Sequence, residues 1–301
     1  MKSQIFKGSI FIVLGAACYG MLGTFVKMAY YDGFNTAEVT LSQFAIGFAV
    51  LLTLTLLKKP ATAKENNTTG IKSPLKLVVA GTSLGLTSIF YYLSVQYIPV
   101  SVAIVLLIQT VWMGVLVEMI MYKRAPGFWK IIAVVTILSG TILATNLLKQ
   151  SINSNWTGFG WGLMAALSYT ATMYSSNKLE LHLPPLKRSL FLILGGLIII
   201  LIIFHTSLNQ HFSFGIFLSW GLVVSLFGTV LPPLLFTRGM PLTGIGLGAI
   251  IASIEIPVSV SMAHLLLKEP VSLLQWAGVM LILFAVVLMN IAGATSHHVA
   301  P

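Results

Sequence analysis

Few side chains in this sequence could do chemistry, and their most informative property is that they interrupt long apolar runs. Glu255 lies halfway along the apolar run 244–267, and Glu118 lies toward the end of the run 99–121. If these runs cross a lipid bilayer, a charge at their centre costs about 2.5–3.5 kcal/mol even on the mildest scale. Glu255 must then be protonated, paired with a cation, or in contact with water, which makes it the first candidate for a functional residue.

Small residues share a helix face with Glu255. Gly248, Ala252, Glu255 and Ser259 recur at steps of 4, 3 and 4 residues, which is the spacing of one face of a helix. Such neighbours permit either close contact with another helix or an open cavity. Two interpretations therefore stay open: Glu255 exchanges a proton or pairs with an amine, or it is a protonated carboxyl group that fixes helix packing.

Three other residues are candidates by position. Thr110 is the counterpart of Glu255 when the chain is shifted by 145 residues, so we expect it opposite Glu255. Lys27, near the end of the run 8–28, could line a pathway or extend its amine to the membrane surface. Pro257 is a candidate hinge, because proline interrupts the hydrogen bonding of a helix.

The remaining candidates each have an ordinary structural alternative. Glu118 could lie near the mouth of a cavity, or it could pair with Lys123 or Arg124. Tyr19 and Trp112 could stack on a flat molecule, although a single aromatic side chain in an apolar run more often belongs to the core or to an interfacial belt. No group of residues has the spacing of a metal site, and we expect no cofactor.

The elements that position these residues follow from the composition. The chain has 301 residues, of which 57% are hydrophobic and 8% are charged, against roughly a quarter charged in soluble domains. A soluble domain could not cover its surface with so few charges, and a disordered chain would be polar. The single cysteine, Cys18, has no partner within the chain. The class that remains is a polytopic, all-α integral membrane protein.

A crossing helix needs about 20 mainly apolar residues, and the sequence contains ten such runs. They are residues 8–28, 36–57, 75–96, 99–121, 129–146, 158–177, 189–204, 214–237, 244–267 and 273–292. If both termini lie on the cytoplasmic side, all basic residues except Lys27, Lys149 and Lys268 fall on that side too. This positive-inside distribution predicts ten spans in the cytoplasmic membrane, with both ends inside. It also explains the net charge of +10 without nucleic-acid binding.

An internal repeat organises the ten runs. A shift of 145 residues aligns the third to fifth runs with the eighth to tenth. Five runs per half is an odd number, so the second half must enter the membrane upside down. We therefore expect two inverted-topology five-helix repeats, residues 1–148 and 149–301, with a site for a small molecule between them at the middle of the membrane.

Several motifs resemble the drug/metabolite transporter superfamily, and within it the EamA-type ten-helix transporters. They are SIEIPV at 253–258, LLKEP at 266–270, QWAGV at 275–279, and the Tyr19-Gly20 pair with Lys27 in the first run. The sequence departs from the family at Gln43, where many members have arginine, and at Lys123-Arg124, which replaces a Gly-Glu turn.

The resemblance implies a secondary transporter, an exporter of small metabolites such as amino acids that works by alternating access, with protons as a possible coupling ion. Efflux of hydrophobic cations and a receptor or scaffold without transport stay open as alternatives. An enzyme is not expected, because the sequence lacks a Gly-rich phosphate loop, a His-Glu-x-x-His metal motif and a Gly-x-Ser-x-Gly elbow. The oligomeric state, monomer or homodimer, is not indicated.

Overall fold

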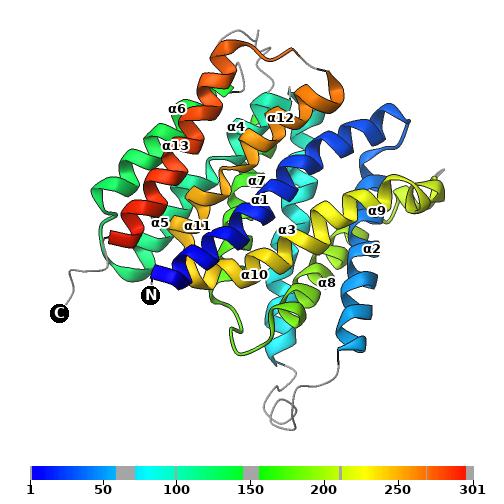
Figure 1. The fold of residues 1–301 in the computed structure, drawn as a ribbon. Coiled ribbons are helices and arrows are strands. Elements are labelled where there is room, and N and C mark those ends of the chain that lie inside the picture. The colour runs from blue at the N-terminus through cyan, green and yellow to red at the C-terminus, as the bar shows by residue number, and fades with distance from the viewer. Residues whose placement is uncertain are drawn as a thin grey trace.

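The computed structural model describes residues 2–58, 72–98, 100–144, 156–209, 212–268 and 270–295, and every regular element in these ranges is helical (Figure 1). The helices are α1 (Lys2–Tyr31), α2 (Thr36–Leu57), α3 (Lys72–Tyr97), α4 (Val100–Leu107), α5 (Thr110–Tyr122), α6 (Phe128–Ala144), α7 (Trp156–Lys178), α8 (Pro185–Ile203), α9 (Trp220–Ser225), α10 (Leu231–Thr243), α11 (Ile245–Ala252), α12 (Glu255–Leu267) and α13 (Leu273–Thr295). Short 3₁₀ turns lie at Ser207–Asn209 and Phe214–Leu218, and a π-helical turn at Leu226–Val230 joins α9 to α10. The expected boundary at 148/149 and the residues 59–71 lie outside the described part of the chain.

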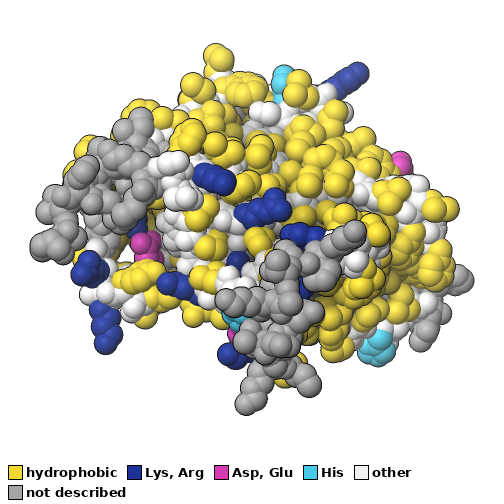
Figure 2. Space-filling view, turned by 60° about the horizontal axis from the view of Figure 1, so that its bottom comes forward, with side chains coloured by type: hydrophobic (Ala, Val, Ile, Leu, Met, Phe, Trp, Pro, Cys, Tyr) yellow, Lys and Arg dark blue, Asp and Glu magenta, His cyan; other side chains and the backbone are white. Residues whose placement is uncertain are grey.

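Among the described residues, seven helical segments are long and apolar enough to cross a membrane. They are Ser3–Tyr31, Thr36–Leu57, Ser73–Tyr97, Ala103–Tyr122, Pro185–Ile203, Trp220–Thr243 and Ile245–Leu267. Phe128–Ala144 and Leu273–Met289 are shorter apolar helices. Large apolar side chains also cover much of the exterior, as Figure 2 shows for one face. Such an exterior fits contact with lipid, and the chain is a multi-pass membrane protein.

Two of these segments are broken at matching positions. α4 and α5 meet around residues 108–109, and α11 and α12 meet around residues 253–254, 145 residues later. At both breaks amide N–H groups donate to carbonyls three residues back: those of 109 and 111 at 3.1 and 2.9 Å, and those of 254 and 256 at 3.2 and 3.1 Å. Both segments end in a residue with left-handed backbone, Lys123 with φ 49° and Lys268 with φ 55°.

The structure therefore differs from the sequence prediction in three of the ten runs. The runs 99–121 and 244–267 are each two helices and not one. The run predicted at 214–237 is helical from Trp220 to Thr243 and begins with a 3₁₀ turn. Pro232 and Pro233 do not end this helix, because they lie in the first turn of α10, where a backbone N–H has no partner within the helix.

Glycines allow the closest helix contacts. α6 packs along α13, and a Cβ atom added at Gly140 would lie 3.0 Å from the carbonyl oxygen of Gly278. α3 packs along α8 with a similar approach between Gly81 and Gly195. Without a hydrophobic force between helices in lipid, such small residues provide the van der Waals contact that holds the bundle together.

Candidate substrate cavity

A cavity lies between α1, α2, α3, α4, α7 and α12 and encloses about 740 Å³ of empty space, its open mouth included. Most of its wall is apolar or aromatic. The described polar lining consists of the Glu255 carboxyl group, four tyrosines and the hydroxyl groups of Thr87, Ser88 and Ser259. A concave, mostly apolar wall with a few polar groups is typical of a binding site for a small molecule.

Glu255 reaches this cavity because of the helix break. It is the first residue of α12, directly after the interruption at 253–254, and Ser259 follows one turn later on the same face. On the other side Gly20 lets α1 approach, since a Cβ atom there would lie 2.5 Å from the carbonyl oxygen of Glu255. The lack of a side chain at Gly20 therefore lets α1 and α12 pack closely beside the carboxyl group.

Four tyrosines line the same cavity as this carboxyl group. The hydroxyl of Tyr169, whose side chain is buried, donates to Oε2 of Glu255 at 3.4 Å. Tyr19 packs edge-to-face on Tyr169 with ring centroids 6.0 Å apart, and Tyr91 lies beside Tyr92 at the same centroid distance. Aromatic faces and a carboxylate both attract a cation, so this arrangement can bind an organic ammonium group.

No described residue of the cavity wall is Lys, Arg or His. Lys27, which could have lined the pathway, is not part of the wall, and its amine lies 6.0 Å from the ring centroid of Tyr31 near the end of α1. An anionic substrate group would therefore find hydroxyl donors in the described wall but no opposite charge.

The structure brings three of the predicted site residues together and separates the others. Glu255, Ser259 and Tyr19 line the cavity. Thr110 is outside its wall: it is buried, and its hydroxyl forms a 2.7 Å hydrogen bond with that of Thr170, which joins α5 to α7.

Trp112 and Pro257 are also absent from the wall. Trp112 is 39% exposed on the outside of the bundle, where its indole N–H donates to Gln109 Oε1 at 2.8 Å. Pro257 is buried in the first turn of α12, three residues after the break, so the interruption of the helix lies before the proline.

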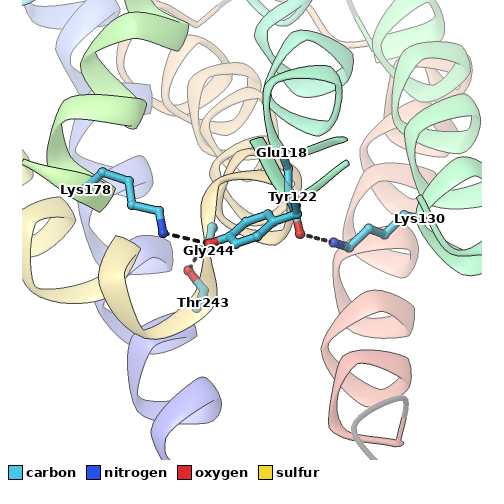
Figure 3. A network of polar contacts seen from close by, with 6 residues as sticks. All are labelled: Glu118, Tyr122, Lys130, Lys178, Thr243 and Gly244. Atoms are coloured by element: carbon cyan, nitrogen blue, oxygen red, sulfur yellow. Dashed lines mark hydrogen bonds and ion pairs between the residues drawn. The ribbon is translucent and has the colours of Figure 1, made fainter. Parts of the chain in front are cut away.

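Glu118 pairs with Lys130 of α6 and not with Lys123 or Arg124. Its Oε1 accepts a 2.6 Å hydrogen bond from Lys130 Nζ (Figure 3). The other oxygen, Oε2, is buried against Gly246 of α11 and has no hydrogen-bond partner among the described residues. Lys123 and Arg124, the two partners considered as an alternative, follow the end of α5, where Lys123 has a left-handed backbone.

A second contact lies beside this ion pair. Lys178, the last residue of α7, donates to the Tyr122 hydroxyl at 2.7 Å, and its amine lies 5.0 Å from the Tyr122 ring centroid. Figure 3 shows both contacts next to the turn from α10 to α11. They join α5 to α6 and to α7 at one end of the bundle.

Sequence reasoning missed Tyr91 and Tyr92 as cavity residues, because an aromatic pair toward the end of an apolar run is typical of an interfacial belt. A signal for Tyr91 was present in the spacing. Leu84, Thr87, Ser88 and Tyr91 recur at three or four residues along α3, and all of them line the cavity.

Comparisons with known proteins agree with this architecture. A solved structure described only as "Crystal structure of protein" shares the fold with a TM-score of 0.76 at 12% identity, covering 95% of this chain and 98% of that one. No curated protein matches the sequence. The profile of the EamA-like transporter family matches residues 6–146 and again residues 156–291. These two segments cover most of the described chain, and the protein belongs to the EamA-like transporter family.

Proposed function

We propose that the protein is a secondary transporter that exports small amine-bearing metabolites, amino acids or related compounds, through the cavity around Glu255. The observation that carries this proposal is the single carboxyl group in an aromatic wall whose described residues include no cation. A membrane-embedded carboxylate is too costly to stay ionised without a partner, and a substrate ammonium group can be that partner.

The leading substrate candidate, an amino acid, carries a carboxylate that the cavity must bind, whereas the alternative, a hydrophobic cation, does not. An amino acid would place its carboxylate against hydroxyl groups, such as those of Thr87, Ser88 and Ser259. A hydrophobic cation without a carboxylate would need no such donors, and the lack of a described cation in the wall favours it. Hydrophobic cations are therefore the second candidate.

We propose further that ten helices cross the membrane as two inverted five-helix halves, residues 1–148 and 149–301. Three features support this, because each recurs at an offset of 145 residues: the helix breaks, the hydrogen bonds at those breaks to carbonyls three residues back, and the left-handed helix ends. The two segments that match the family profile fall one in each half. The excess of Lys and Arg supports both termini on the cytoplasmic side of the cell membrane.

Transport then proceeds by alternating access, with the halves rocking about the cavity. The Tyr122–Lys178 contact joins the two halves, so it must break whenever that end of the bundle opens. Protons are the coupling ion in this scheme, because a proton and a substrate ammonium group compete for Glu255. Release of one favours binding of the other, which gives exchange of substrate against protons.

The test is substrate flux into proteoliposomes that hold the purified protein. The panel is L-phenylalanine, phenethylamine and N-acetylphenylalanine, which carry both charged groups, only the amine and only the carboxylate. We expect flux of at least one amine-bearing compound, stimulation by a proton gradient, and none of the acetylated compound. Phenethylamine alone would favour the cation alternative.

Glu255→Gln preserves volume, and we expect it to fold but to lose most flux and its pH dependence. The matched control is Glu180→Gln, which makes the same change in a turn between α7 and α8, away from the cavity. Normal flux in Glu255→Gln between about pH 5.5 and 8.5 would show that Glu255 only packs helices. Loss of flux in both variants would show that the effect is not specific to the cavity.

A further inference from the structure

A second hollow lies at one end of the bundle and is distinct from the substrate cavity. It is a groove with about 960 Å³ of empty space, its open side included, between α1, α10 and the turn before α8, and its wall carries Lys7, Arg188 and Arg238. None of its described lining residues is Asp or Glu. Figure 2 shows the end of the molecule that holds the N-terminus, where Lys and Arg side chains gather amid an apolar surface.

The two exposed cations are held together by a close helix contact. A Cβ atom added at Gly8 of α1 would lie 3.0 Å from the carbonyl oxygen of Gly239 of α10, and one at Gly239 would lie 2.8 Å from that of Gly8. Lys7 and Arg238 each precede one of these glycines. The helix crossing therefore fixes two positive side chains, one from each family-matched segment, on the same groove.

Arg188 adds a third charge, which is buried. Its guanidinium group donates to three backbone carbonyls, those of Leu179 at 3.0 Å, Thr237 at 2.9 Å and Ser176 at 2.6 Å. These partners are neutral, and no carboxylate pairs with Arg188 among the described residues, although its side chain is only 2% exposed. Its positive charge therefore stays uncompensated by a protein anion.

The nearest carboxyl group along the chain is engaged elsewhere. A hydrogen bond from Ser73 and the charge of Lys76, whose amine lies 3.5 Å from Glu180, hold the pKa of the Glu180 carboxyl below its usual range. Glu180 is thus an anion at neutral pH, but its charged partners are Lys76 near the start of α3 and His182, and not a residue of the groove. The groove keeps its positive field.

An apolar track leads away from the charges. Gln4, Lys7, Phe11 and Leu14 recur at steps of 3, 4 and 3 residues along one face of α1. The first three line the groove, and Leu14 is 51% exposed beyond it. This face changes from polar to apolar in the order in which a phospholipid changes from headgroup to acyl chain.

We propose that this groove binds the phosphate headgroup of an anionic phospholipid, with one acyl chain lying along Phe11 and Leu14. Basic pockets between membrane helices recognise such headgroups through Arg and Lys. Arginine and lysine bind phosphate groups well, because both donate charge-assisted hydrogen bonds to the phosphate oxygens. The site is separate from the substrate cavity, and lipid binding requires only that the protein lies in a membrane. The proposal is therefore independent of the transport proposal.

The experiment titrates the detergent-solubilised full chain with phosphatidylglycerol and follows binding by native mass spectrometry and by the unfolding temperature. Phosphatidylcholine and inorganic phosphate are the comparison ligands. We expect phosphatidylglycerol to bind and to raise the unfolding temperature, while phosphatidylcholine binds much more weakly. Equal binding of the two lipids would overturn the proposal, and equal stabilisation by inorganic phosphate would show an anion site that does not need the lipid.

Lys7→Gln/Arg238→Gln removes the two exposed charges and leaves the Arg188 hydrogen bonds intact. We expect this double variant to weaken phosphatidylglycerol binding about thirtyfold, the product of a five- to sixfold effect for each of two basic residues near a membrane surface. Arg124→Gln/Lys187→Gln is the matched control, since neither residue lines the groove. Unchanged binding in the first variant, or an equal loss in both, would refute a site at this groove.

Discussion

The contact between α1 and α12 at Gly20 allows a sharp test of how the cavity is built. Gly20→Ala would place a Cβ atom 2.5 Å from the Glu255 carbonyl oxygen and 2.8 Å from Val258 Cβ, whereas ordinary contact begins at 3.4 Å. Because a backbone carbonyl cannot rotate away, the two helices must separate locally by about 0.9 Å, the difference between 3.4 and 2.5 Å. Overpacking of this kind costs about 1–3 kcal/mol.

We expect Gly20→Ala to lower the unfolding temperature by about 4 °C, as measured in detergent. Flux should fall about tenfold, because displacement of α1 moves Tyr19 relative to Glu255. Gly23→Ala is a matched control: Gly23 lines the same cavity, but a Cβ atom there has no neighbour within 4 Å. Equal stability and equal flux in the two variants would refute the close α1–α12 contact.

Two further predictions concern stability, each measured as the free energy or temperature of unfolding in detergent. Arg188→Met removes the donor to three backbone carbonyls, among them that of Thr237, to which Pro241 cannot donate because it has no N–H. We expect the free energy of unfolding to fall by about 3 kcal/mol, and a fall of less than about 1 kcal/mol would contradict the capping role. Asn35→Ala removes the hydrogen bond of the capping box in which Asn35 Oδ1 accepts from the Glu38 backbone amide at 3.0 Å. We expect the free energy of unfolding to fall by about 1 kcal/mol, whereas unchanged stability would mean that solvent caps α2 equally well.

The membrane class and most helices could be predicted from the sequence, because apolar length is a property of composition alone. Seven of the thirteen helices in the described chain each match one predicted run, and the other six fall in pairs on the three remaining runs. The breaks at 108–109 and 253–254 could not be predicted in this way. At 253–254 a local breaker is present, because Pro257 has no N–H to donate to the Ser253 carbonyl four residues back. At 108–109 the equivalent position is Trp112, so that interruption depends on tertiary packing.

The roles of some polar residues also depend on contacts that are distant in the sequence. Glu38 is an ionisable residue near the start of α2, and the structure shows it as part of the helix cap, where its side chain also accepts a 2.7 Å hydrogen bond from the Ser213 amide. Sequence analysis did not single out Arg188, because it counts among the basic residues expected on the cytoplasmic side. One of its three carbonyl partners, that of Thr237, lies far away in the sequence and lacks a donor within α10 because Pro241 has no N–H.

The cavity could be predicted in part, and the residues that were found share one property. Glu255 was identified from the free energy of burying a charge, and Ser259 from helical spacing relative to it; both arguments use one helix only. Thr110 lies outside the described wall, because the shift of 145 residues matches it to Glu255 by position in the chain but does not place it in the same cavity. Equivalent helices in two repeats can have the same break and still present different surroundings to their first residue. Of the two broken segments, only the second places a carboxyl group in the described cavity wall, so the proposed exchange of protons for substrate uses one carboxyl group and not a matched pair.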